Sequence, residues 1–434
     1  MQIQNSKYER TIRRRSRVGC LILFAILVLS SGAMTQPDTM YIEIDYMVLR
    51  DTQGNIVHSH EPRVTEINAV KQMFACQGIV LVIDVDDELP HIDVIGRDPA
   101  DSLNMFNYYG PNSFGDIKTH YKNHWLGWHY CVFAHRYQST HYTPSGSSGL
   151  SEIGGDDFIV SLGGWGADSI GTAFERAATL AHEFGHNLGL RHTGIMEEDV
   201  TGPHTPNLPS TMSYLCQLAG IRSIYVEKGL APALTNLLKE IDYSHGRLCP
   251  LVESSLDERL GVGMKAVDWN CNGHIDYSFV DHDLARDSTG GWCLSNGTRS
   301  ALLDFNEWNN IEDNARKKSP AELQNLPVSE CVTLEERNEF FAKHASLSEP
   351  DLQVEPCVVN EPVWAAPGNG FYATGVCGDP YIGFLVGYAA APAGDILYLR
   401  YGSYDVDVPS ILLNKPLIIT TTHTAVIRPV GKKK

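Results

Sequence analysis

The chain has 434 residues, of which 43% are hydrophobic and 20% are charged. This composition is that of an ordinary globular protein, and the length allows two or three domains. The formal net charge at pH 7 is -18, which argues against nucleic acid as a partner because an acidic surface repels phosphates. An acidic chain of this kind suits a soluble extracellular protein.

The N-terminal residues have the pattern of an export signal. A basic segment ends at Arg17 and is followed by an apolar run from Val18 to Leu29, then by small residues up to Ala33. This apolar run is too short to span a bilayer comfortably, so we expect a cleaved signal peptide at residues 1–33. The sequence therefore predicts a secreted protein without a stable membrane anchor after signal removal, and an uncleaved anchor is the alternative.

Nine cysteines follow the predicted signal peptide, and several disulfides are expected in an exported chain. The odd number leaves at least one free thiol or one intermolecular bond. The local pairs Cys271–Cys293 and Cys357–Cys377 are hypotheses, since spacing does not fix connectivity. The absence of any C-x-x-C pair argues against zinc ligation by cysteine and against thioredoxin chemistry.

Strands and a helix are predicted in the first half of the chain. Residues 41–48 have strand character, residues 65–77 predict a helix with one apolar face, and residues 78–85 predict a buried strand. A further strand is expected within residues 128–137. Five histidines lie close together in this region, but their spacings fit no metal-ligand pattern, so surface and packing roles are favoured over a second metal site. These histidines are His120, His124, His129, His135 and His141.

The next predicted helix, over residues 172–186, carries a metal-binding pattern. His182 and His186 are four residues apart, so their side chains lie on one helix face and are one turn apart. Both imidazoles can then point at one metal ion from a rigid support. Glu183 faces another direction, from which it can reach a metal-bound water rather than the metal.

The residues after this helix predict a third ligand. Gly189 can take the left-handed conformation that ends a helix, and this turn would bring His192 back toward the first two histidines. Three protein ligands leave the fourth position of tetrahedral zinc to water, which distinguishes catalytic zinc sites from closed structural ones.

Residues 182–192 match H-E-x-x-H-x-x-G-x-x-H at every fixed position, and residues 210–214 read S-T-M-S-Y. The chain therefore resembles the metzincin zinc peptidases, and its S-x-M-x-Y form resembles the astacin, serralysin and pappalysin branches. The resemblance implies one catalytic Zn2+ ion, with Glu183 as the general base toward a zinc-bound water. It also implies that Met212 lies beneath the metal and that Tyr214 is a switchable ligand or an oxyanion stabiliser.

The same resemblance implies an α+β fold for residues 34–250, in which a twisted mixed sheet supports the zinc-binding helix. In metzincins, the edge strand before that helix pairs with the substrate backbone, which is recognition by strand addition. Residues 157–162 are expected to form this edge strand, with Phe158, Ile159 and Val160 as substrate-pairing positions. An interior strand is the alternative.

A second motif follows in residues 251–350, which are expected to form a subdomain and a linker with a helix near residues 333–345. Side-chain oxygens in the spacing of an EF-hand calcium loop, with glycine at the sixth position, make Ca2+ a second candidate cofactor. Phe279 stands where that loop has a bidentate glutamate, so a hydrogen-bonded turn is the alternative. The candidate calcium residues are Asp268, Asn270, Asn272, His274 and Asp276. Together with the zinc pattern, this region resembles secreted bacterial metallopeptidases.

The last segment, residues 351–434, is rich in glycine, proline, tyrosine and β-branched residues. It predicts a small all-β module, either one or two coils of a parallel β-helix or a small β-sandwich. Attachment to a substrate or a surface is one expected role, and a purely structural appendage is the other.

The sequence as a whole predicts a secreted zinc-dependent endopeptidase that acts on protein or peptide substrates. The alternative is a metal-binding adhesion or surface-binding protein without catalytic activity. Glu183 favours the enzyme, because inactive relatives of such peptidases typically lose this carboxylate.

Overall fold

The computed structural model describes most of residues 38–357 and six short strands beyond residue 362. Within residues 38–357, the description leaves out residues 101–103, 194–205, 228–236, 249, 260, 263–265, 285–300, 303, 320–321 and 324–325. The predicted signal peptide at residues 1–33 also lies outside the described residues. No helix in the described part of the chain is long and apolar enough to cross a membrane.

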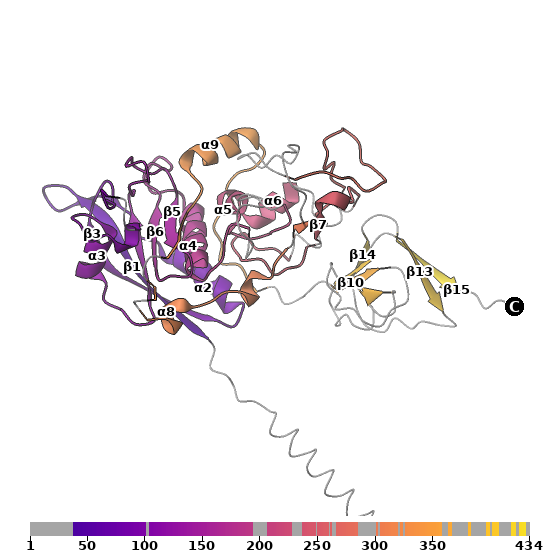
Figure 1. The fold of residues 1–434 in the computed structure, drawn as a ribbon, viewed down its shortest axis with the longest axis horizontal. Helices are drawn as coiled ribbons and strands as arrows, with labels where there is room; N and C mark the ends of the chain where they lie inside the picture. The colour runs from indigo at the N-terminus through magenta and orange to yellow at the C-terminus, as the bar shows by residue number, and fades with distance from the viewer. Residues whose placement is uncertain are drawn as a thin grey trace, which may run out of the picture.

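A mixed seven-stranded sheet forms the centre of the fold (Figure 1). Its strands are β1 (Thr39–Arg50), β2 (Ile56–Ser59), β3 (Val80–Pro90), β4 (His129–Ala134), β5 (Gly149–Glu152), β6 (Asp157–Ser161) and β9 (Val328–Glu330). The hydrogen-bonded order is β2-β1-β4-β6-β5-β9, and β3 also pairs with β1. Strands β1, β3, β4 and β6 are parallel, whereas β2, β5 and β9 join by antiparallel pairing. The predicted α+β class with a mixed sheet is therefore confirmed.

Alternating side chains of the strands build two cores on opposite faces of the sheet, because successive residues of a strand point to opposite faces. In β4, Cys131 and Phe133 join the core that contains helices α2 (Val64–Ala75) and α4 (Ala173–Asn187). Tyr130 and Val132, between them, join a smaller core under helix α3 (Phe114–Tyr121). The sheet is thus covered on both faces, and α4 lies on the face with the larger core.

Strand β6 is an interior strand, which corrects the prediction that residues 157–162 form the substrate-binding edge. It pairs with β4 on one side and with β5 on the other. Phe158, Ile159 and Val160 are all at most 2% exposed. The sequence Gly149-Leu-Ser-Glu152 of β5 contains no β-branched residue and is only four residues long, so it gives little strand signal. The interior alternative is confirmed.

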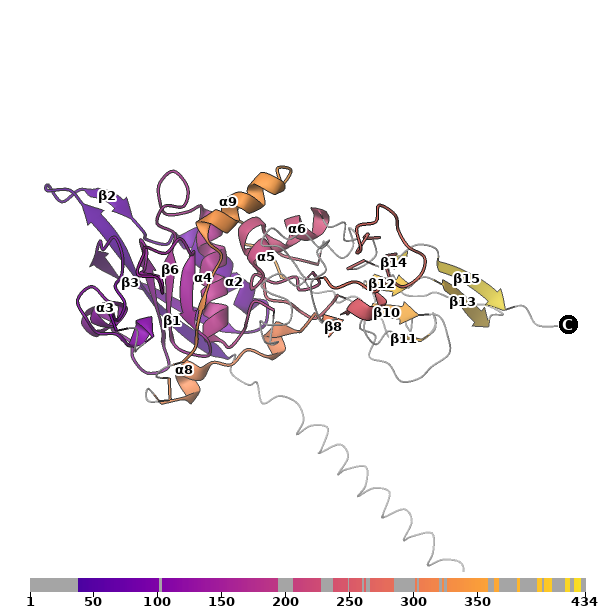
Figure 2. The same cartoon turned by 45° about the horizontal axis from the view of Figure 1, so that its top comes forward.

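Shorter elements follow helix α4 in the chain, and the first of them packs against it. They are α5 (Tyr214–Ala219), α6 (Ile221–Glu227), β7 (Leu251–Val252), η3 (Glu253–Ser255), β8 (Ala301–Leu302), η4 (Glu307–Asn309), α8 (Asn314–Lys317) and α9 (Leu334–Lys343), while η1 (Met105–Asn107) precedes α3. Helix α9 confirms the helix expected near residues 333–345, and it lies close to α4 and α5 in both views (Figures 1 and 2). An ion pair between Arg337 of α9 and Glu175 of α4 connects the two helices.

The described strands beyond residue 362 pair in parallel with one another. They are β10 (Val363–Ala366), β11 (Tyr381–Ile382), β12 (Ile396–Leu399), β13 (Gly402–Asp407), β14 (Ile418–Thr421) and β15 (Ala425–Val430). Strands β11, β10, β12 and β14 form one sheet, and β13 pairs with β15. The all-β module at residues 351–434 stays a prediction, because most of this segment lies outside the described residues.

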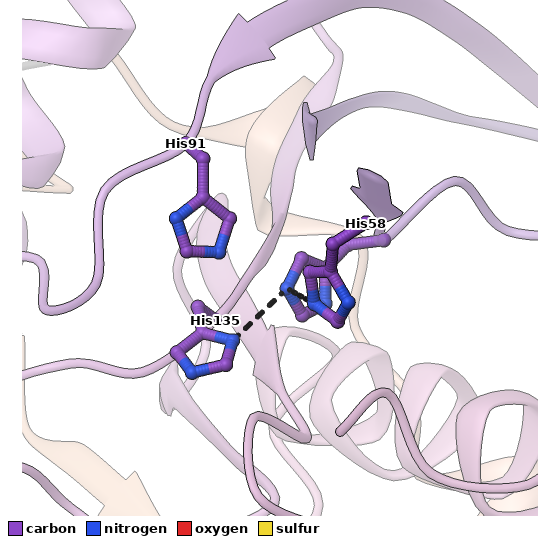
Figure 3. A group of neighbouring side chains, drawn as sticks. His58, His91 and His135 are labelled. Carbon is purple, nitrogen blue, oxygen red and sulfur yellow. Dashed lines mark hydrogen bonds between the residues drawn. The ribbon is translucent and has the colours of Figure 1, made fainter. Parts of the chain in front are cut away.

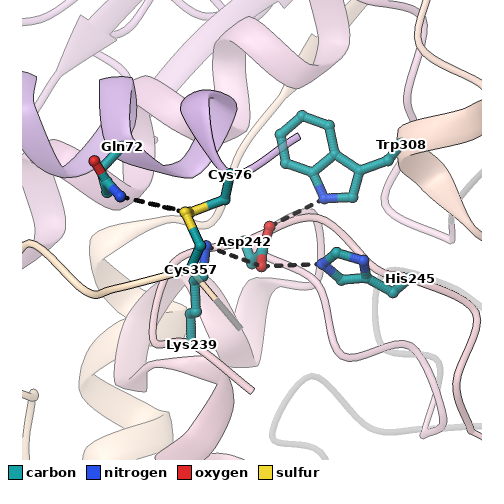
Figure 4. The surroundings of a disulfide bond; sticks show 7 residues. All are labelled: Gln72, Cys76, Lys239, Asp242, His245, Trp308 and Cys357. Atoms are coloured by element: carbon teal, nitrogen blue, oxygen red, sulfur yellow. Dashed lines mark hydrogen bonds and ion pairs between the residues drawn. A yellow bond between two sulfur atoms is a disulfide. The ribbon is translucent and has the colours of Figure 1, made fainter. Parts of the chain in front are cut away.

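A disulfide joins Cys76, at the end of α2, to Cys357 (Figure 4). The hypothesised pair Cys357–Cys377 is therefore wrong, because the chain after α9 returns to α2. Cys271 is also disulfide-bonded, with its partner outside the described residues. Near the Cys76–Cys357 bond, the carboxylate of Asp242 accepts hydrogen bonds from Trp308 at 3.0 Å and lies 3.2 Å from His245.

Candidate metal centre

Helix α4 begins and ends at the residues that its sequence predicts. Thr172 is the N-cap: its hydroxyl accepts a hydrogen bond from the Glu175 amide, and the Glu175 carboxylate accepts one from the Thr172 amide. This capping box satisfies two amides that the first turn leaves without partners. At the other end, Gly189 has a φ of +90°, and the Leu190 amide donates to the carbonyl of Gly185. The predicted glycine turn after the helix is confirmed.

This turn brings the three predicted histidines together. Nε2 of His186 lies 3.1 Å from Nε2 of His182 and 3.0 Å from Nε2 of His192. All three rings are buried, with exposures of at most 4%. Nitrogen atoms that bind one tetrahedral zinc ion at about 2.0–2.1 Å lie at similar distances from one another. The spacing of these three nitrogens therefore fits a tetrahedral zinc site.

The tautomers of two of these rings point their lone pairs at the common centre. Nδ1 of His182 lies 2.9 Å from the carbonyl oxygen of Thr211, and Nδ1 of His186 lies 2.8 Å from that of Leu190. A carbonyl oxygen only accepts hydrogen bonds, so each Nδ1 carries the proton and each Nε2 presents a lone pair. Two lone pairs facing each other repel unless a cation lies between them.

Burial favours the neutral, ligand form of the same rings. It lowers the pKa of His182 and His186 far below the usual range, and the nearby His192 lowers both pKa values further. A neutral imidazole is the form that binds a metal ion. The donor set, its spacing and its protonation state all fit one Zn2+ ion held by three imidazole nitrogens.

Met212 contacts helix α4 at Gly185, the residue before His186. Its side chain is fully buried, and its sulfur packs so closely on Gly185 that a Cβ atom there would overlap it. Gly185 lies between the two helical histidines in the sequence. Thr211, the residue before the methionine, supplies the carbonyl that orients His182. The turn therefore both contacts the helix and fixes one ligand ring.

Glu183 is completely buried beside the three histidines. Burial raises the pKa of its carboxyl group well above the usual range. Its Oε2 atom has no hydrogen-bond partner among the described residues. Its Oε1 atom lies 2.5 Å from Sγ of Cys331. Glu183 is therefore a buried carboxyl group beside three imidazole nitrogens, with one oxygen that has no hydrogen-bond partner among the described residues.

Cys331 is the residue of this site that sequence reasoning did not identify. Its Sγ atom and the ligand nitrogens of the three histidines all lie within 4.8 Å of one another. It follows β9, which pairs with β5 at the edge of the sheet. The odd cysteine count indicated a free thiol. The cysteine spacing gave no sign that Cys331 lies beside Glu183, because 148 positions separate the two residues in the sequence.

Tyr214 lies next to the metal site at the first residue of α5. Its ring centroid is 4.5 Å from that of His192 and 5.9 Å from that of His182. Its hydroxyl donates a hydrogen bond of 2.7 Å to the backbone carbonyl of Glu330. The tyrosine predicted to stabilise an oxyanion thus contacts a peptide carbonyl of the chain itself.

The packing of Gly149 against Glu183 gives a prediction. A Cβ atom at Gly149 would overlap the Glu183 carboxylate and would lie 2.7 Å from the carbonyl of Ile159. We expect Gly149→Ala to displace the carboxylate and to cost about 1–3 kcal/mol in stability, as overpacking does. The midpoint of thermal unfolding and kcat/KM are the measurements. Gly146→Ala is the matched control, since the nearest atom to its Cβ lies 3.8 Å away; equal behaviour of the two variants would contradict the prediction.

The histidine-rich stretch has mostly the packing and surface roles that were favoured. His129 is buried with Nδ1 3.0 Å from the side-chain oxygen of Asn187, and His124 stacks on Trp128. His120 and His141 are exposed. His135 is different, because it lies in a cluster of four histidines with His58, His60 and His91.

The candidate calcium loop folds as a hydrogen-bonded turn in the structure. Both oxygens of Asp268 accept hydrogen bonds from backbone amides, and one oxygen of Asp276 accepts from the side-chain amides of Asn270 and Asn272. The buried Glu258, outside the motif, accepts from the backbone amides of Trp269 and Asp276. These bonds agree with the alternative of an Asx-rich turn, and calcium binding stays a prediction.

No family model matches this chain, and the searches of curated proteins and of solved structures likewise find no match.

Proposed function

We propose that this protein is a secreted zinc-dependent endopeptidase of the metzincin type. The observation that carries the proposal is the convergence of three buried imidazole nitrogens, 3.0–3.1 Å apart, beside the buried carboxyl group of Glu183. The protein or peptide substrate follows from this chemistry, because hydrolysis of an amide needs a polarised carbonyl and a proton acceptor in one place.

The residues of the site divide the work between them. His182, His186 and His192 would hold Zn2+, which supplies a Lewis acid and lowers the pKa of a water that it binds. Glu183 accepts the proton of the attacking water and passes it to the leaving amine. Tyr214 donates its hydroxyl to the carbonyl oxygen on which negative charge develops. Met212 and Thr211 hold the helix and the first ligand in position.

The alternative function, a metal-binding protein without catalysis, is supported by Cys331. Three histidines and one cysteine make a four-ligand set, which is the composition of closed structural zinc sites. A closed structural zinc site needs no carboxyl group beside it, however, and the burial of Glu183 next to the three histidines costs free energy. The enzyme therefore agrees better with the site as a whole.

Metal removal tests the proposal. We expect the purified protein, or its Cys331→Ser variant, to hydrolyse a denatured protein substrate, to lose this activity after removal of metal by a chelator, and to regain it with Zn2+. Product formation is followed by mass spectrometry. Hydrolysis that continues in the metal-free protein would exclude the zinc mechanism, and no hydrolysis by either metal-loaded chain would favour the alternative function.

Export is part of the proposal, because residues 1–33 have the pattern of a signal peptide. We expect N-terminal sequencing of the protein recovered from the medium to begin at Met34. A mature chain that still begins at Met1 and fractionates with membranes would support the uncleaved anchor instead.

A further inference from the structure

Four histidines from separate segments meet at one end of the sheet, away from the proposed zinc triad in the sequence. His58 and His60 lie in and just after β2, His91 follows β3, and His135 follows β4. Strands β3 and β4 are parallel and flank β1, so their carboxyl ends come to the same end of the sheet. Figure 3 shows the rings of His58, His91 and His135 turned toward one another.

The spacing of these rings resembles that of the three histidines on and after α4. Nε2 of His60 lies 2.9 Å from Nε2 of His58 and 3.3 Å from Nδ1 of His135. One ligand nitrogen from each of the four rings lies within 4.8 Å of all the others. Nitrogens bound to one tetrahedral zinc ion at about 2.0–2.1 Å have comparable separations. An ordinary packed pair of histidines does not bring one ring nitrogen close to two others in this way.

His91 supplies an independent sign of a missing ligand. Its Nδ1 atom lies 3.4 Å from the carboxylate of Asp93, and its Nε2 atom is buried without a hydrogen-bond partner among the described residues. A carboxylate on one ring nitrogen, with the other nitrogen directed to a metal ion, is the usual second-layer arrangement around histidine ligands. The unpartnered nitrogen therefore agrees with a cation in the cluster.

The charged groups that face the cluster do not replace a metal ion. The negative charge of Asp93 works to raise the pKa of His91 and His135, and that of Asp168 works to raise the pKa of His58. The positive charge of Arg136 lowers the pKa of His135, and that of Arg176 lowers the pKa of His60. Two anionic and two cationic side chains therefore face the cluster, and their charges balance.

We propose that His58, His60, His91 and His135 bind a second divalent transition-metal ion of the Zn2+ class in a closed, four-nitrogen site. Because all four positions of a tetrahedral ion are filled by protein, the site is structural. It fastens the β1–β2 hairpin to the ends of β3 and β4. Imidazole ligands suit Zn2+, and also Cu2+ or Ni2+, better than Ca2+ or Mg2+.

Metal stoichiometry tests this site independently of peptidase activity. The chain is stripped of metal, reloaded with Zn2+, desalted and analysed by mass spectrometry for zinc per polypeptide. We expect two zinc ions in the wild type and in His141→Ala, an exposed histidine that serves as the matched control. We expect one in the double variant His91→Ala/His135→Ala and one in His186→Ala/His192→Ala.

The double variant of the triad decides the question even if His91→Ala/His135→Ala fails to fold. One zinc ion in the wild type together with none in His186→Ala/His192→Ala would overturn the second site. Two ions in a folded His91→Ala/His135→Ala chain would overturn it as well, because the ion would then be bound elsewhere.

A different observation concerns the edge of the sheet next to the triad. Residues 327–333 run antiparallel along β5, with Leu150 opposite Glu330 and Glu152 opposite Val328. The hydrogen bonds extend beyond the strand, from the Ile153 amide to the Pro327 carbonyl and from the Ser148 amide to the Val332 carbonyl. We call residues 327–333 the strap. This is the bonding pattern of an extended peptide that adds a strand to a sheet edge.

The strap also reaches the atoms that would act in catalysis. Sγ of Cys331 lies 2.5 Å from Glu183 and within the group of histidine nitrogens. The Glu330 carbonyl accepts the hydrogen bond of Tyr214, and Oγ of Ser329 lies 3.4 Å from Nε2 of His192. A substrate could not pair with β5 while the strap lies there.

We infer that the strap is a built-in inhibitor, which occupies the substrate edge and places the Cys331 thiolate at the fourth position of the proposed zinc ion. The inference rests on the proposed function. On coordination the thiol gives up its proton to solvent, and no redox step is involved. Displacement of the strap exposes β5, frees Glu183 and returns the fourth position to water.

Two measurements test the strap. In the Co2+-substituted wild type we expect a near-ultraviolet thiolate-to-metal charge-transfer band that is absent in Cys331→Ser. We also expect Cys331→Ser to raise kcat/KM on a peptide library by roughly tenfold or more. Cys216→Ser, a change at another buried cysteine that forms no disulfide, is the matched control and is expected to leave both the band and the activity unchanged.

The outcomes separate the strap from the proposed function. Equal, chelator-sensitive activity of wild type and Cys331→Ser would overturn the strap and leave the peptidase standing. No hydrolysis by either metal-loaded chain would remove the peptidase, and inhibition with it. If Cys331→Ser does not fold, the Co2+ spectrum of the wild type decides alone, since a missing thiolate band contradicts ligation by Cys331.

Discussion

Glu183→Gln, made in the Cys331→Ser chain, is expected to lower kcat by about a thousandfold, within the usual contribution of a general base. Glutamine has nearly the shape of glutamate but does not accept the proton of the attacking water. The three histidine ligands are unchanged, so we expect the same zinc content per chain. Single-turnover hydrolysis and metal analysis on the same preparation are the measurements.

Glu152→Gln is the matched control for this change. Glu152 is a buried carboxyl group on the neighbouring strand β5, and burial together with Asp157 and Asp156 raises its pKa well above the usual range. Glutamine has nearly the same shape, so this change removes a buried carboxyl group that lies outside the proposed catalytic set. Activity retained by Glu183→Gln, or lost equally in Glu152→Gln, would remove the assigned role of Glu183.

Arg176→Met is expected to destabilise the protein by about 3–5 kcal/mol, the usual effect of breaking a buried ion pair on one side. Arg176 of α4 donates to both carboxylate oxygens of Glu66 on α2, at 3.0 and 2.5 Å, and neither side chain is more than 3% exposed. The variant leaves the carboxylate buried without its partner. The free energy of unfolding is measured with denaturant on the metal-loaded chain.

Two comparisons sharpen this experiment. The double variant Glu66→Leu/Arg176→Met removes both charges and is expected to recover much of the loss, because an apolar pair of similar volume suits the interior. Arg50→Met breaks the exposed pair of Arg50 and Glu88, whose side chains are 41% and 37% exposed, and should cost much less because water screens the pair. A loss in Arg176→Met as small as that in Arg50→Met would show that the buried pair contributes little.

The triad of His182, His186 and His192 could be predicted because its geometry is local. His186 follows His182 by four positions on one helix, and a left-handed glycine is enough to return His192. Helix pitch and the glycine turn fix these positions without any knowledge of the remaining chain. The methionine turn came from the resemblance, and the structure places Met212 against the same helix.

The edge of the sheet could not be predicted, because it depends on contacts between distant segments. Strand β5 is too short to give a signal, and β9 reaches it from almost 180 positions later in the chain. Cys331 has no partner within its own segment that would mark it as a ligand. Pairing over such separations is decided by the packing of the whole domain.

The cluster of His58, His60, His91 and His135 was missed for a related reason. His135 was grouped by sequence with four histidines that face elsewhere, whereas its neighbours in space follow the ends of other strands. Spacing along the chain identifies ligands only when one helix or one loop carries them. Ligands from three strand ends are brought together by sheet topology, which the sequence pattern does not reveal.

The Cys76–Cys357 bond affects how a cut in the chain would act on the strap. Cleavage shortly before residue 327 would leave the inhibitory segment attached through Cys357 to the end of α2. Cleavage between residues 333 and 357 would leave it attached through its N-terminal side. A tethered segment has an effective concentration in the millimolar range, so after a single nick it rebinds readily. Lasting activation by proteolysis therefore requires two cuts, or one cut together with reduction of this bond.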